Sequence, residues 1–172
     1  MKHVVEDAIL CLKKMNNDER YMREALKEAK KAYEEDEIPV GAVIVYNNKI
    51  IARGHNTRET NQSVLGHAEI SSILKAEKKI RDWRLDGYSM IVTLEPCNMC
   101  SMIIKECRLD NVYYFLPKKN EDISWEININ KEQINDYKEY TSKFKDLLTV
   151  FFNKASFFNI FIKTSNWSGK YL

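Results

Sequence analysis

Two runs rich in β-branched residues lie close together in the first third of the chain, at residues 40–46 and 49–53. Only Asn47 and Asn48 separate them, and asparagine readily adopts the positive φ angles that a two-residue hairpin turn requires. The pattern therefore predicts a β-hairpin in this part of the chain.

Helical patterns flank the hairpin on both sides. Upstream, an amphipathic helix capped by Asn17 or Asp18 is expected to end within the acidic residues 34–37 and to lie on the sheet. Downstream, the pattern predicts four elements: a helix at 66–79, a strand at 88–94, a helix opened by Pro96 and a strand at 111–116. The predicted order is α, β, β, α, β, α, β.

The two ends of the chain are less regular. Residues 4–15 predict a short amphipathic helix with a packing role. Residues 117–130 have no clear period, and apolar positions between 134 and 151 predict one or two closing helices. The apolar stretch 157–162 fits either a strand or a packed helix.

The composition favours a single domain. A chain of 172 residues with 44% hydrophobic residues is long enough for a core that folds unaided, and its few glycines and prolines form no linker. We expect a core over residues 18–154, an extra N-terminal helix within 1–16 and a C-terminal tail at 155–172.

Charge and hydropathy limit the possible partners. Glu6 and Asp7 interrupt the N-terminus before a signal peptide or membrane span can form, so we expect a cytoplasmic protein without membrane contact. The net charge is only +2, with 27 basic and 25 acidic residues interspersed. Because long nucleic acids are bound by strongly basic surfaces, any nucleic-acid site is expected to be small.

The candidate chemistry lies at the starts of two predicted helices. His67 precedes one of them, and Cys97 and Cys100 lie in the first turn of the other. Three protein ligands of the imidazole and thiolate type, with a position left for water, are typical of a catalytic zinc ion. A helix places residues three apart on one face, and its positive end favours thiolates. We therefore predict that these three residues bind one Zn²⁺ per chain.

Glu69 is the candidate catalytic residue. It follows His67 by two positions, close enough to reach a metal-bound water without being a ligand. Zinc lowers the pKa of a bound water to about 7, and a nearby carboxylate can carry the released proton to a departing amine. Together, His-X-Glu and Pro-Cys-X-X-Cys form the signature of the zinc deaminases.

Two other readings of the cysteines remain open at this point. A Cys-X-X-Cys pair at a helix start also fits thioredoxin-like redox chemistry. A closed structural zinc site needs a fourth protein ligand. On a continuous helix Cys107 would lie about 10 Å from Cys100 along the axis, which is too far for both to bind one ion. Cys11 and His55 are not excluded as fourth ligands by this argument, although Cys11 and Cys107 are expected to be buried apolar residues.

His55 and Asn56, at the end of the second hairpin strand, are candidates for substrate contact. His55 is expected near the mouth of the pocket, where contact with substrate and the absence of such contact are equally open. Asn56 is the stronger candidate, because an amide offers a hydrogen-bond donor and an acceptor to a base edge.

The segments around these residues resemble the cytidine-deaminase-like superfamily and, within it, the bacterial tRNA-specific adenosine deaminases. The resemblance spans residues 18–116. It rests on five segments: 38–43 (IPVGAV), 54–56 (GHN), 66–69 (GHAE), 83–85 (WRL) and 93–100 (TLEPCNMC).

This resemblance implies an α/β fold, a three-layer α/β/α sandwich with a mixed sheet of about five strands. It also implies a homodimer that converts adenosine to inosine at the wobble position in a tRNA anticodon loop, with Asn56 contacting the base. Zinc would be held by His67, Cys97 and Cys100, with Glu69 as proton shuttle. For the pair at 151–152, the resemblance leaves a structural role and an anticodon-loop contact equally open.

Departures from the family pattern keep two alternatives open. Ser101 and Met102 replace a small Ala-Gly pair, Lys118 stands where the family has an aspartate associated with RNA, and the 117–130 segment lacks the family's glycine pattern. One alternative is a deaminase of a free cytosine, guanine or adenine base, a nucleoside or single-stranded DNA. The other is a non-catalytic subunit with the deaminase fold, although the intact Glu69 argues against that.

Overall fold

The computed structural model describes residues 19–117, 131–133 and 138–162, with side chains as far as residue 153 in the last range. The described elements are a first helix over residues 19–34, β1 (Gly41–Tyr46), β2 (Lys49–His55), α2 (Ala68–Ile80), β3 (Ser89–Leu94), α3 (Asn98–Glu106), β4 (Asn111–Leu116), β5 (Lys131–Gln133) and α4 (Lys138–Ile162). The predicted order of elements is confirmed as far as β4.

The hairpin forms as the sequence predicts. Asn47 and Asn48 have φ angles of 46° and 59°, and the flanking strands pair in antiparallel register from Gly41 opposite His55 to Tyr46 opposite Lys49. Two consecutive residues with positive φ match the twist of the strands, which is why an Asn-Asn turn suits this hairpin.

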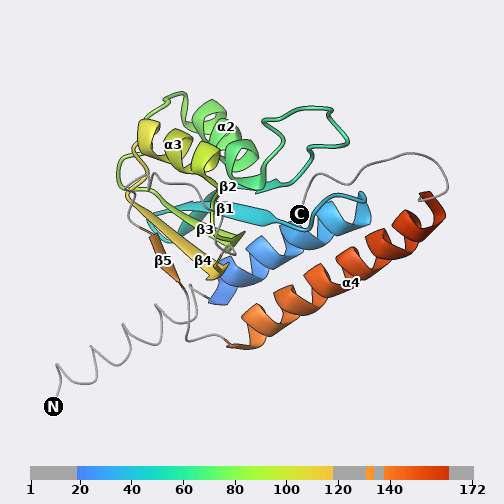
Figure 1. Cartoon of the computed structure of the whole chain (residues 1–172). Coiled ribbons are helices and arrows are strands. Elements are labelled where there is room, and N and C mark those ends of the chain that lie inside the picture. Colours follow the sequence, from blue (N-terminus) through green and yellow to red (C-terminus); the bar gives the residue numbers. More distant parts are fainter. Residues whose placement is uncertain (1–18, 118–130, 134–137, 163–172) are drawn as a thin grey trace, which may run out of the picture.

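The sheet is mixed and has five strands in the order β2-β1-β3-β4-β5. β1 is antiparallel to both of its neighbours, whereas β3, β4 and β5 are parallel to one another. A parallel connection needs a crossover, and α3 supplies it between β3 and β4. Helices cover both faces of this sheet (Figure 1), so the predicted three-layer sandwich is confirmed.

Alternate residues along the strands enter two separate cores. On one face, Ala42 and Ile44 of β1 pack with Ile73 of α2 and Ile104 of α3. On the other face, the buried residues come from the first helix, the sheet and α4, namely Tyr21, Met22, Ala25, Ala29, Val43, Ile91, Phe115, Tyr140 and Phe144. This alternation follows from the two-residue period of a strand with helices on both sides.

Two glycines allow helices to approach the sheet closely. A Cβ at Gly54 of β2 would overlap the backbone of α2, and one at Gly41 of β1 would overlap the backbone of the first helix. Glycine at these positions therefore sets the distance between the sheet and the helix on each face.

The structure also answers questions that the sequence left open. The closing segment is one helix, and this helix includes the stretch 157–162. β5 is a strand that the local pattern did not predict. The predicted helix at 4–15, the cap at Asn17 or Asp18 and most of the 117–130 segment lie outside the described residues. No helix in the described part combines the length and apolar character needed to cross a membrane.

Candidate metal centre and active site

The candidate site lies at one edge of the sheet. β2 and β3 both run antiparallel to β1, which lies between them, so β2 and β3 end at the same edge. The segment after β2 leads to His67, and the segment after β3 leads to Cys97. Sheet topology therefore brings together residues that are 30 positions apart in the sequence.

His67 and Cys97 occupy equivalent positions, because each is the N-cap residue of its helix. His67 precedes α2 and Cys97 precedes α3, and both have extended backbone angles. Neither side chain forms a capping hydrogen bond. Both side chains are thus free of the usual N-cap role and lie near the positive ends of two helix dipoles, which favour thiolates and other anions.

The donor atoms have the spacing of a tetrahedral zinc site. The Nδ1 atom of His67 lies 3.6 Å from Sγ of Cys97 and 3.4 Å from Sγ of Cys100. Tetrahedral angles with ordinary Zn–S and Zn–N bond lengths give an N···S separation of about 3.6 Å. All three donor atoms lie within 4.8 Å of one another. The predicted ligands therefore fit a zinc ion without rearrangement.

The two cysteines differ in proton affinity. A hydrogen bond from Cys100 is the main cause that lowers the pKa of Cys97 to about 4, and His67 acts in the same direction. The pKa of Cys100 is raised well above its usual value, because it donates to Cys97 and is buried. Cys97 correspondingly raises the pKa of His67 through a hydrogen bond. The two thiols and the imidazole therefore lie close enough to shift one another's pKa through hydrogen bonds.

Glu69 lies in the first turn of α2 and is buried, with 4% of its surface exposed. Burial raises the pKa of its carboxyl group, and the nearby Cys97 thiolate acts in the same direction. Its carboxyl group also contacts Cys100. A carboxyl group whose pKa is raised by burial is suited to exchange protons with a reacting group.

The cluster contains no fourth His, Cys, Asp or Glu from the part of the chain that the structure describes. Cys107 lies in the apolar core and donates to the Ile104 carbonyl oxygen at 3.3 Å, as expected for a buried thiol. His55 bonds to Glu28 at 2.9 Å and to Glu35 at 3.3 Å, so both ring nitrogens face carboxylates. Cys11 lies outside the described residues.

Asn56 is buried, and a hydrogen-bonded loop connects it to His67. The Thr57 amide donates to the Gly66 carbonyl oxygen at 2.8 Å, so Asn56 and His67 directly flank this bond. The side-chain Nδ2 of Asn56 donates a hydrogen bond to the Glu37 carboxylate, at 3.3 Å. The sequence did not indicate this buried contact, because the acidic run at 34–37 predicted only the end of a helix.

The aromatic pair at the end of the described side chains divides into two environments. Phe151 packs edge to face on Tyr33, with ring centroids 6.4 Å apart, whereas Phe152 is 40% exposed. Phe151 thus has a packing role. Next to the cluster in the sequence, Ser101 is buried and Met102 is exposed, so the larger residue of this pair lies at the surface.

The mixed sheet, the two helix N-termini and the His, Cys, Cys and Glu set together define the class of zinc-binding deaminases. The family model of the cytidine and deoxycytidylate deaminase zinc-binding region matches residues 15–116. The chain therefore belongs to this deaminase family, and zinc is its expected metal.

Individual relatives agree with this assignment. The chain is 51% identical over 106 residues to the tRNA-specific adenosine deaminase of Bacillus subtilis, a match that covers 60% of this chain and 66% of that protein. It thus spans slightly less than two thirds of that relative. It is 36% identical over 142 residues to the tRNA-specific adenosine deaminase of Aquifex aeolicus, covering 79% of this chain and 94% of that protein.

A similar fold has been solved in a study of A-to-I editing by tRNA:A34 deaminases at the wobble position of transfer RNA. That structure matches with a TM-score of 0.62 and 31% identity, over 67% of this chain and 98% of the other.

Proposed function

We propose that this chain hydrolyses adenosine to inosine at the wobble position of a transfer RNA. The observation that carries the proposal is the zinc-compatible cluster of His67, Cys97 and Cys100 beside the buried Glu69. The choice of substrate is supported by the two tRNA-specific adenosine deaminases and the tRNA:A34 deaminase structure described above.

In this proposal the residues have distinct roles. His67, Cys97 and Cys100 hold the metal, which supplies a Lewis acid that makes water nucleophilic at neutral pH. Glu69 takes a proton from the attacking water and delivers it to the leaving amino group. Asn56 binds the base edge, since it is buried and separated from His67 only by the loop at 57–66.

The proposal is tested with zinc-loaded protein and an arginine tRNA anticodon stem-loop that carries adenosine at the wobble position. We expect inosine to form, and we expect no product from the same RNA with cytidine there. Glu69→Ala should keep its zinc and lose at least about 100-fold in kcat. Cys97→Ala should lose the metal. Folded, zinc-loaded wild-type protein that forms no inosine would rule out this substrate.

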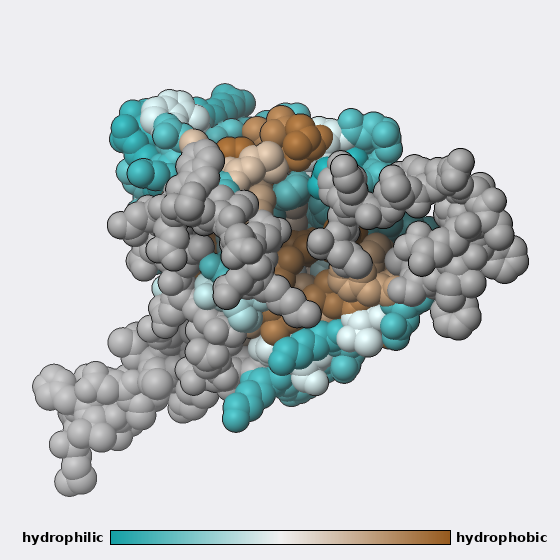
Figure 2. Space-filling view, viewed as in Figure 1, coloured by the Kyte–Doolittle hydropathy of each residue, from teal (hydrophilic) through white to brown (hydrophobic). Residues whose placement is uncertain are grey.

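We also propose that two copies form a homodimer through α2 and α3. Leu74 on α2 and Met102 on α3 are both more than half exposed, and Figure 2 shows hydrophobic atoms at the surface on the side of these helices. Contiguous apolar patches at the surface mark interaction sites more often than single exposed apolar side chains do. Leu74→Lys with Met102→Lys should shift the mass measured by light scattering from dimer to monomer. Val150→Lys, an equally exposed position on α4, should not.

A transfer RNA substrate would place the enzyme in the cytoplasm. The three cysteines of the described chain, Cys97, Cys100 and Cys107, are all free thiols, which is consistent with a reducing compartment.

A further inference from the structure

Glu37 is a buried carboxylate close to the proposed base-binding residue. It follows the first helix, where Asp36 has a φ angle of 59° and the Glu37 amide donates to the Ala32 carbonyl oxygen at 2.9 Å. Only 1% of Glu37 is exposed. A left-handed residue and a backbone hydrogen bond therefore fix the direction in which this side chain leaves the main chain.

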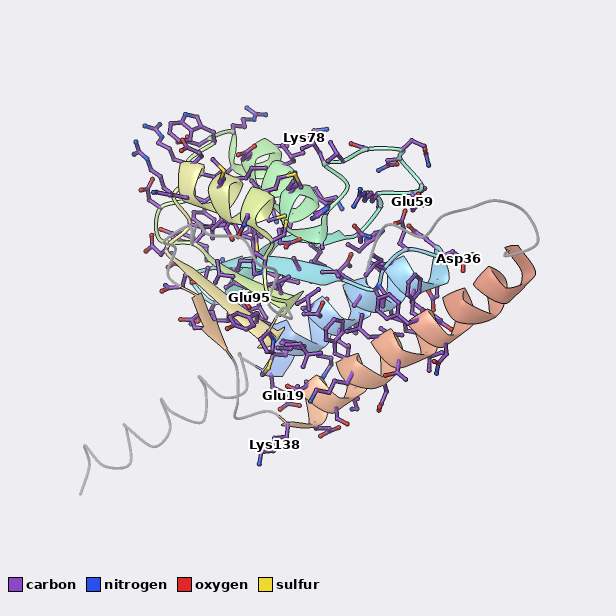
Figure 3. The ribbon with its side chains drawn as sticks, viewed as in Figure 1. Glu19, Asp36, Glu59, Lys78, Glu95 and Lys138 are labelled. Carbon is purple, nitrogen blue, oxygen red and sulfur yellow. The ribbon has the colours of Figure 1, made fainter. Side chains whose placement is uncertain are left out.

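Both carboxylate oxygens of Glu37 accept hydrogen bonds, one from Asn56 and one from the loop at 57–66. Oε1 accepts from the Thr60 backbone amide at 2.6 Å, and Oε2 accepts from Nδ2 of Asn56 at 3.3 Å. Figure 3 shows Asp36, next to Glu37, on the same side of the molecule as Glu59 in the loop that contains Thr60. One side chain thus holds both the loop and the base-binding residue.

The chemistry of a carboxylate determines which way the Asn56 amide points. A carboxylate only accepts hydrogen bonds, so the Asn56 group that faces it must be the NH₂ group. The Oδ1 atom must then point away from Glu37. Because Asn56 is 6% exposed, bulk water cannot readily satisfy the amide in the reversed orientation.

We propose that Glu37 is a positioning residue that determines base specificity by fixing the orientation of the Asn56 amide. The site then offers the Oδ1 atom as an acceptor, which favours a base with an N–H donor at that point. The amino group that is removed from adenosine is such a donor. This inference rests on the proposed role of Asn56 in base binding.

The variant Glu37→Gln tests the proposal because it keeps the shape and removes one acceptor. The Thr60 amide cannot change its polarity, so the single oxygen of the glutamine should keep the shorter bond to Thr60. Its NH₂ group then faces Asn56, whose amide must reverse. The reversed Asn56 amide then presents its NH₂ group, instead of Oδ1, to the N–H donor of the base. Because a hydrogen bond to the base is replaced by two facing donors, we expect kcat/KM to fall roughly 10- to 100-fold.

A second variant separates this effect from a general loss of packing. Asn56→Asp alone places two carboxylates side by side and should be poorly active. Combined with Glu37→Gln, the new aspartate accepts from the glutamine NH₂ and again offers an oxygen to the base. We expect the double variant to be at least tenfold more active than Asn56→Asp. Glu59→Gln, the same change on an exposed loop residue, should leave activity unchanged.

The zinc content of each variant is measured first. Each variant is then assayed for ammonia release from five substrates, namely the wobble-adenosine RNA, the same RNA with cytidine at that position, and the free bases adenine, guanine and cytosine. If wild type acts only on another base, the proposed tRNA function fails while the Glu37 comparison continues on that substrate. A double variant no better than Asn56→Asp would overturn the inference, and this comparison does not require the Glu37→Gln single variant to fold.

The amide orientation also has a readout that is independent of turnover. The side-chain NH₂ signal of Asn56 is assigned by NMR from its loss in Asn56→Asp. We expect one of its protons to exchange slowly in wild type, because it is bonded to Glu37, and the signal to shift in Glu37→Gln. An Asn56 signal that is the same in both proteins would contradict the proposed contact.

Discussion

The packing of α2 against β2 leaves no room for a methyl group at Gly54. A Cβ atom there would lie 2.5 Å from the Ser72 amide nitrogen and would also overlap the Ala68 carbonyl oxygen. Both atoms belong to the backbone, so no side-chain rotation relieves the overlap. Ordinary van der Waals contact starts at 3.4 Å. Gly54→Ala therefore forces α2 to move about 1 Å away from the strand.

This movement acts directly on the metal centre. His67 is the N-cap of α2, whereas Cys97 and Cys100 are held by α3, so a shift of α2 separates the imidazole from the thiols. Overpacking costs typically about 1–3 kcal/mol, and a misplacement of 1 Å can cost about 100-fold in rate. We expect Gly54→Ala to lower the free energy of unfolding by about 2 kcal/mol. It should also weaken zinc binding and reduce kcat/KM by about 100-fold.

Urea unfolding, zinc retention against a competing chelator and the deaminase assay measure the three effects. Gly87→Ala is the matched control, because it adds the same methyl group in an exposed turn with a φ angle of 81°. That conformation costs an alanine about 1–2 kcal/mol, so stability should fall without a change in zinc retention. Wild-type zinc retention and turnover in Gly54→Ala would refute the argument that this contact positions α2.

Two further predictions concern the second core and the charge of the metal site. Phe144 is fully buried against Phe115, so Phe144→Ala should lower the free energy of unfolding by about 3–5 kcal/mol, whereas exposed Phe152→Ala should lower it by less than about 1 kcal/mol in the same urea titration. Zinc binding should release the Cys100 proton and, below the raised pKa of His67, the imidazolium proton as well, while Cys97 is already a thiolate. The number of protons released on zinc binding should therefore fall toward one as the pH rises through the pKa of His67. Calorimetry in buffers of different ionisation enthalpy counts these protons. A number that stays constant with pH would contradict the prediction.

The parts of the fold that sequence predicted depend on local chemistry. Asn47 and Asn48 indicate the hairpin because asparagine tolerates positive φ, and the turn forms within a few residues. The convergence of the candidate metal ligands was predictable for a similar reason. Cys97 and Cys100 share one turn of helix, and residue types that bind zinc are rare enough for their spacing to be informative.

The parts that sequence did not predict depend on contacts between distant segments. β5 has only three residues, too few for an apolar alternation to be recognised, and it exists because it pairs with β4. The stretch 157–162 has an apolar pattern that suits a strand as well as a helix, and it is helical as part of α4. Glu37 lies in an acidic run that is typical of an exposed helix end, and its burial becomes evident only when Thr60 and Asn56 are placed around it.

The proposed site is assembled from both faces of the sheet, and in this proposal metal binding is separated from base recognition. The metal ligands belong to α2 and α3 on one face, whereas Glu37 follows the first helix on the other. A Cβ at Gly41 would lie 2.8 Å from Cβ of Glu28 and would overlap the backbone of the first helix, so Gly41→Ala should displace that helix.

We expect Gly41→Ala to raise KM roughly 10-fold, because displacing the first helix removes the buried hydrogen bond between Glu37 and Asn56. Zinc retention should stay at the wild-type level. Gly54→Ala should instead affect zinc retention first, because it displaces the helix that begins beside His67. The two variants make the same chemical change on neighbouring strands and differ in which helix moves. Equal zinc loss in both would mean that the two layers respond as one unit, and the separation of metal binding from base recognition would then be wrong.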